Sequence, residues 1–161
     1  MLRLSPLSVP AGLYIHIPFC VKKCGYCDFF SELCGDETLV SEVLEQTLRQ
    51  ISCFSDELAG PEIDTIFIGG GTPSVLPLKP FDPFLVSLRK LAPRVREFTV
   101  EANPETVSPG FIRSCVENGV TRLSIGIQSF SDSLLHRVGR NCSRARIDSA
   151  DVVWLDWPAG I

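Results

Sequence analysis

Long apolar runs and an excess of positive charge are both missing from this 161-residue sequence. No stretch reaches the roughly 18 apolar residues of a membrane span, and the N-terminus carries prolines where a signal peptide has an apolar core. The net charge of −4 offers no basic surface to nucleic acid. With 45% hydrophobic and 21% charged residues, we expect a globular cytoplasmic protein without a membrane span or a nucleic-acid partner.

Strand and helix patterns alternate along the chain. Four short apolar segments predict strands: residues 13–17, 64–68, 98–101 and 122–127. Four segments with helical spacing or capping signals predict helices: residues 37–58, 84–91, 109–118 and 132–138. Asp36 and Ser131 are the expected N-caps of the first and last helices, and Pro83 is expected near the start of the second. This order predicts an α/β fold with a parallel sheet, either doubly wound or a barrel or partial barrel.

A fourth clustered cysteine is also missing. Cys20, Cys24 and Cys27 follow the first predicted strand with C-x3-C-x2-C spacing. In a chain without a visible export signal, clustered thiols indicate metal binding more than disulfides. Three thiolates are one ligand short of a structural zinc site or of a [4Fe–4S] cluster with a cysteine on every iron. The spacing therefore leaves open a cluster with one exchangeable iron, or zinc with Cys34 or His16 as fourth ligand.

Glycine and polar residues follow the other predicted strands and meet the cysteines at one edge of a parallel sheet. The stretch IFIGGGTPS places three glycines, residues 69–71, where backbone can approach a ligand closely. Glu101 can accept hydrogen bonds from ribose hydroxyls or an amine, Gln128 can donate and accept, and Arg140 can bind a carboxylate. The structural alternatives are a tight turn for the glycines and solvated surface side chains for the others.

Four segments together resemble the radical S-adenosylmethionine (SAM) superfamily: LYIHIPFCVKKCGYCDF, IFIGGGTPS, FTVEANPETV and TRLSIGIQSF. The similarity is strongest to oxygen-independent coproporphyrinogen III oxidases and their relatives, the heme chaperones, and it runs from about Leu13 to Arg140. It implies an α/β partial barrel of the radical SAM type, with about four of six βα units present.

The resemblance implies a [4Fe–4S] cluster on Cys20, Cys24 and Cys27, with SAM chelating the fourth iron. Proteins of this type cleave SAM to methionine and a 5′-deoxyadenosyl radical. Matched positions imply SAM contacts at Tyr14, Tyr26, Gly70, Gly71, Thr72, Glu101, Gln128 and Arg140.

Within this group, details favour the heme chaperone branch. Phe29 stands where the oxidases carry a further cysteine. This branch implies heme as a further ligand and a heme-accepting protein as partner, and it leaves open whether the chain is an enzyme. The alternative is coproporphyrinogen III dehydrogenase activity on a porphyrinogen. His16 and His136 are interpreted as structural or solvent-facing, not as heme ligands.

The resemblance divides the chain into an N-terminal extension (1–12), a radical SAM core (13–140) and a divergent tail (141–161). Family members are more than twice this length, and the tail does not fit their pattern, although residues 152–155 are apolar enough for a fifth strand. We therefore expect a truncated or frameshifted chain. An inactive fragment and a zinc-binding α/β module remain the alternatives from other functional classes.

Overall fold

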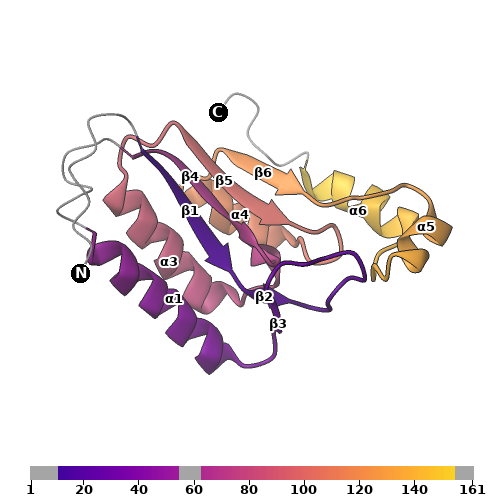
Figure 1. Cartoon of the computed structure of the whole chain (residues 1–161). Helices are drawn as coiled ribbons and strands as arrows, with labels where there is room; N and C mark the ends of the chain where they lie inside the picture. The colour runs from indigo at the N-terminus through magenta and orange to yellow at the C-terminus, as the bar shows by residue number, and fades with distance from the viewer. Residues whose placement is uncertain (1–10, 55–62, 155–161) are drawn as a thin grey trace.

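A parallel sheet forms the centre of the computed structural model, which describes residues 11–54 and 63–154 (Figure 1). Its strands are β1 (Ala11–Ile17), β4 (Ile63–Gly70), β5 (Glu97–Ala102) and β6 (Arg122–Ile125). The helices are α1 (Glu37–Ser52), α3 (Leu78–Leu91), α4 (Pro109–Glu117), α5 (Asp132–Arg137) and α6 (Arg144–Trp154). Three short elements complete the fold: β2 (Phe19–Cys20), β3 (Glu32–Leu33) and the 3-10 helix η1 (Pro73–Val75).

The strand order distinguishes the two architectures that the sequence leaves open. The main sheet has the order β1-β4-β5-β6, so each strand lies beside its predecessor, and all three pairings are parallel. Right-handed crossovers without a reversal of strand order place all their helices on the same face of the sheet. A doubly wound sheet needs a reversal, whereas a barrel does not. The structure therefore confirms an α/β fold of the partial-barrel kind.

Alternating side chains give the sheet one buried and one open face. Ile15 and Ile17 of β1 are buried, whereas Tyr14 between its buried and half-buried neighbours is 55% exposed. The buried strand residues share one core with apolar residues of α1, α3 and α4, including Leu44 and Phe81. Figure 1 shows the strand arrows ending toward the region of β2 and β3, where the connecting loops gather. The helices thus support the sheet from one face while the loops at the carboxyl ends build the site.

The starts of three helices can be compared with the capping and proline signals in the sequence. Asp36 is the N-cap of α1, and its carboxylate accepts from the Thr38 and Leu39 amides, as expected. Ser131 stands at the N-cap of α5, but its hydroxyl makes no capping hydrogen bond. Helix α3 begins at Leu78, so Pro83 lies inside it, contrary to the expectation of a start near Pro83.

The tail differs from the expected pattern. Residues 152–154 belong to α6, so the suggested fifth strand is wrong there, and residue 155 lies outside the described residues. Ile147 of α6 is buried, and α6 contacts α4. The first helix ends at Ser52, and the last part of its expected range, residues 55–58, also lies outside the described residues. Among the helices that the structure describes, none is long and apolar enough to cross a membrane.

Candidate functional site

A cavity of about 310 Å³ lies at the carboxyl ends of the strands. Ten of the eleven site residues expected from sequence line it: Cys20, Cys24, Tyr26, Cys27, Gly70, Gly71, Thr72, Glu101, Gln128 and Arg140. Tyr14 is not among its lining residues. The fold therefore brings loops from four strands to one concave surface, as a parallel sheet does with residues placed after its strands.

The three clustered cysteines lie on the wall formed by the segment after β1. Cys20 ends β2, whose pairing with β3 fixes the start of the loop, and the Cys27 amide donates to the Cys24 carbonyl at 3.2 Å. All three thiols are partly exposed and none is in a disulfide. The loop thus presents three accessible sulfurs to the cavity.

The glycine loop holds this cysteine segment against the sheet. The Gly71 amide donates to the Ile17 carbonyl at 2.8 Å, and the Thr72 amide donates to the Phe19 carbonyl at 2.7 Å. A Cβ on Gly71 would stand 2.5 Å from the Phe19 carbonyl oxygen, so only glycine fits there. The sequence predicts that these glycines let backbone approach a ligand closely. In the structure Gly71 approaches the chain's own backbone beside Phe19, and this contact fixes the position of Cys20.

Glu101 is oriented by the neighbouring strand. The Gly70 amide, at a backbone φ of 99°, donates to Glu101 Oε2 at 3.0 Å. Tyr14 lies on the open face of the sheet, where its ring stacks on Phe67 and its hydroxyl contacts His16 Nδ1 at 3.4 Å. Burial, followed by the charge of Glu101, raises the pKa of the Tyr14 phenol. Tyr14 is thus electrostatically coupled to the site without lining the cavity.

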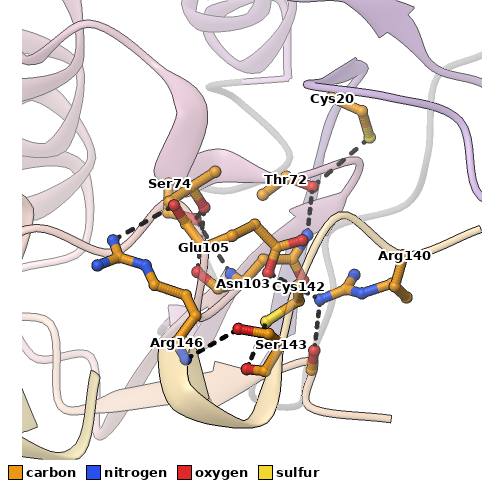
Figure 2. Close-up of polar contacts among 11 residues, drawn as sticks. Cys20, Thr72, Ser74, Asn103, Glu105, Arg140, Cys142, Ser143 and Arg146 are labelled. Carbon is orange, nitrogen blue, oxygen red and sulfur yellow. Dashed lines mark hydrogen bonds and ion pairs between the residues drawn. The ribbon is translucent and has the colours of Figure 1, made fainter. Parts of the chain in front are cut away.

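Arg140 also lines the cavity and is almost fully buried, and Figure 2 shows its polar contacts. Its guanidinium pairs with Glu105 at 3.1 Å and donates to the Gly126 carbonyl at 2.7 Å. Its Nε lacks a hydrogen-bond partner and is the one such buried side-chain nitrogen or oxygen in the part of the chain that the structure describes. A buried donor without a partner is costly, and a ligand group that accepts from this atom would have to displace the atoms that now cover it.

Gln128 and Tyr26 complete the lining. Gln128 has a φ of 64°, a left-handed conformation that costs a non-glycine residue energy and is often found at ligand sites. A Cβ on Gly126 would lie 2.8 Å from Gln128 Nε2, so glycine leaves room for this amide. Burial raises the pKa of the Tyr26 phenol, as does Cys24, while the nearby Arg140 opposes the shift.

The zinc alternative finds little support in this geometry. Cys34 packs against the hydrophobic core, and its thiol contacts the Val75 carbonyl at 3.6 Å outside the cavity lining. His16 Nε2 contacts the Phe30 carbonyl at 3.0 Å. Among the described residues, no group of three or more Cys, His, Asp or Glu side chains is placed to hold one metal ion. One zinc ion would draw its thiolates close together, because each Zn–S distance is about 2.3 Å.

The same donors fit a [4Fe–4S] cluster with bound SAM in their chemistry. A cluster binds its cysteines on different irons, so three cysteines can hold it while the fourth iron stays open to an exchangeable ligand. The three soft thiol donors line one cavity, and Lys22 and Lys23 on its rim place positive charge near a group that carries thiolate charge. Arg140 lines the same cavity, and its guanidinium is the group that suits a carboxylate. The residues present therefore match both groups in chemistry.

Residues 14–151 match the radical SAM superfamily, and the chain belongs to it. Members of this superfamily generally use SAM together with a [4Fe–4S] cluster.

Among characterised proteins, the chain is 42% identical to the heme chaperone HemW of Escherichia coli over 142 residues, which cover 87% of this chain and 36% of that protein. It is 38% identical over 151 residues to the heme chaperone HemW of Haemophilus influenzae, covering 90% and 39%. The solved structure of the coproporphyrinogen III oxidase HemN of Escherichia coli, a radical SAM enzyme, matches with a TM-score of 0.77 and 25% identity, covering 89% and 34%. The chain thus spans little more than a third of these relatives.

Asn103 follows the third predicted strand, and the sequence places it at this edge of the sheet, although not as a ligand contact. Four other lining residues were not singled out from the sequence: Glu105, Ser124, Gly126 and Asn141. Glu105 lies three residues past the end of β5, so its place after a strand was an available signal. The pairing of Glu105 with Arg140 was not, because the two residues are 35 positions apart and meet only through the tertiary fold.

Proposed function

We propose that this chain is the cluster- and SAM-binding part of a radical SAM protein of heme metabolism, of the heme chaperone kind. The observation that carries the proposal is the cavity lined by three partly exposed cysteines together with the buried Arg140. The similarity to HemW over 87% of the chain supports heme as the further ligand.

Five residues of the cavity have a defined part in this proposal. Cys20, Cys24 and Cys27 bind three irons, and Arg140 Nε–H donates to the SAM carboxylate. Glu101, held by the Gly70 amide, accepts hydrogen bonds from ribose hydroxyls or the amino group. The [4Fe–4S] cluster, when bound, supplies the single electron on which radical SAM chemistry depends.

Anaerobic reconstitution with iron and sulfide tests the proposal. The chain should acquire four irons and a broad visible absorbance, and Cys20→Ala, Cys24→Ala or Cys27→Ala should each abolish it. Cys34→Ala, which removes a neighbouring thiol outside the cavity lining, should leave the absorbance intact. A colourless protein that takes up one zinc and loses it in Cys34→Ala would contradict the proposal and support the zinc-binding module.

Coproporphyrinogen III dehydrogenase activity is the second candidate, because the fold matches HemN with a TM-score of 0.77. The two functions predict different results with the reconstituted chain. Heme chaperone function predicts a Soret band on titration with hemin and no loss of coproporphyrinogen III in the presence of SAM and reductant. Dehydrogenase function predicts consumption of coproporphyrinogen III coupled to SAM cleavage.

A further inference from the structure

The hydroxyl of Thr72 lies between a candidate cluster ligand and an amide (Figure 2). Thr72 Oγ1 is 3.5 Å from Cys20 Sγ and 3.0 Å from Asn103 Nδ2, and the Thr72 residue is 4% exposed. Thr72 is also the N-cap residue of η1, but its hydroxyl makes no capping hydrogen bond. The hydroxyl is therefore committed to the contact between Asn103 and Cys20 and not to the local helix.

The chemistry of the two end groups fixes the direction of this hydrogen-bond chain. An amide Nδ2 only donates, so Thr72 Oγ1 accepts from Asn103. The single hydroxyl proton is then directed to Cys20 Sγ, which as an iron-bound thiolate can only accept. Each member of the chain thus has one role: Asn103 donates, Thr72 relays, and Cys20 accepts.

Asn103 is itself held firmly by its backbone. Its amide donates to Ser74 Oγ at 3.1 Å, and its carbonyl accepts from the Thr106 and Val107 amides at 3.0 and 3.1 Å. A Cβ on Gly126 would stand 2.7 Å from Asn103 Oδ1, so the side-chain amide fits closely against that glycine. The donor is therefore pre-positioned before any ligand binds.

We propose that Thr72 and Asn103 are positioning residues that maintain a hydrogen bond on the Cys20 sulfur and thereby raise the reduction potential of the cluster bound there. The inference rests on the proposed function, because it needs a cluster on Cys20. Hydrogen bonds to cluster sulfurs stabilise the more negative, reduced state, and they are one of the main means by which a protein sets the potential of such a centre.

Redox titration of the reconstituted chain, followed by electron paramagnetic resonance of the reduced cluster, tests this role. Thr72→Val removes the hydroxyl at nearly constant volume. At a fixed potential set with dithionite and mediators, its ratio of reduced to oxidised cluster should fall roughly tenfold, which is about 59 mV for a one-electron couple. Thr72→Ser keeps the hydroxyl and should stay within about twofold of the parent chain. Thr47→Val makes the same exchange in α1, where the Thr47 hydroxyl donates to the Val43 carbonyl, and serves as the matched control that should leave the ratio unchanged.

Asn103→Asp separates the relay from a simple charge effect. An aspartate cannot donate to Thr72 and instead draws the hydroxyl proton away from Cys20. The ratio of reduced to oxidised cluster should therefore be lower in Asn103→Asp than in the parent chain. In a Thr72→Val background only the added charge remains, and the effect of Asn103→Asp should be clearly smaller. Equal effects of Asn103→Asp in both backgrounds would remove Asn103 from the proposal.

The parent chain provides a measurement that does not depend on any variant folding. Exchange into D₂O should shift the Fe–S stretching bands in its Raman spectrum, because a deuteron would replace the proton donated to Cys20. A cluster that assembles fully, shows no isotope shift and titrates identically in Thr72→Val would overturn the inference and leave the proposed function standing. Failure of the parent chain to assemble a cluster would overturn the proposed function itself.

Discussion

Burial gives the cysteines of this chain two distinct chemical characters. The three clustered thiols are partly exposed at the cavity, whereas Cys115 of α4 is fully buried in the core. Burial, followed by the charge of Asp82, raises the Cys115 pKa from 9.0 to about 12. A thiol with so high a pKa is neither a good metal ligand nor a nucleophile at neutral pH. Cys115 thus behaves as a small apolar residue of the core.

This raised pKa predicts an alkaline loss of stability. Above pH 9.0 the unfolded chain releases the Cys115 proton while the folded chain keeps it up to about pH 12, so the free energy of unfolding falls as pH rises. The stability is fully present below pH 9.0 and declines above it by up to about 1.4 kcal/mol per pH unit. Urea titrations at pH 7.5, 9.5 and 10.5 should show this decline in the parent chain relative to Cys115→Ala. Parallel pH dependences in the two chains would contradict the assignment.

At the scale of single elements, the two predicted caps show what a hydroxyl or carboxylate at a helix start contributes. Asp36 accepts from two amides of α1, whereas the Ser131 hydroxyl contacts Ser133 Oγ at 3.0 Å and caps nothing. Asp36 is exposed and Ser131 is half-buried, and the change from serine to alanine removes only a hydroxyl, so loss of packing adds little to the effect of either replacement.

We therefore expect Asp36→Ala to lower the free energy of unfolding by about 1 kcal/mol. Ser131→Ala should change it by no more than about 0.5 kcal/mol, because no helix amide loses a partner. Urea denaturation followed by circular dichroism measures both. Equal losses in the two variants would show that the Asp36 contacts do not stabilise α1 beyond what any polar N-cap supplies.

Some features of the fold and the site were predictable from the sequence, and others were not. Apolar alternation and a capping aspartate are local, so they predicted the four main strands, the parallel sheet and the start of α1. Placement after strand ends predicted a shared cavity for the cysteines and Glu101. The early start of α3 escaped prediction because Pro83 is accommodated inside the helix. The Thr72–Asn103 contact escaped because it joins residues 31 positions apart.

At the scale of the whole molecule, the cavity joins segments that are distant in sequence. The cysteine segment and the residues after α5 meet directly, since the Gly25 amide donates to the Val138 carbonyl at 3.2 Å. Arg140 then reaches back to Glu105 after β5. A ligand that contacts both the cysteine segment and Arg140 would therefore be bound only by the fully folded arrangement, and its binding energy would add to the stability of the fold.

SAM should accordingly stabilise the cluster-loaded chain but not the unloaded one. At about 100 times its Kd, a ligand that binds only the folded state adds about 2.7 kcal/mol to the free energy of unfolding. For a chain of this size that corresponds to a rise in Tm of roughly 5–10 °C. Anaerobic thermal melts of the reconstituted parent chain measure the shift, and Cys24→Ala, taken through the same reconstitution, is the unloaded control. An equal shift in both chains would mean that SAM binds without the cluster and that the clustered cysteines have no part in holding it. A shift confined to the loaded chain would show that the cysteine segment and Arg140 act on one ligand.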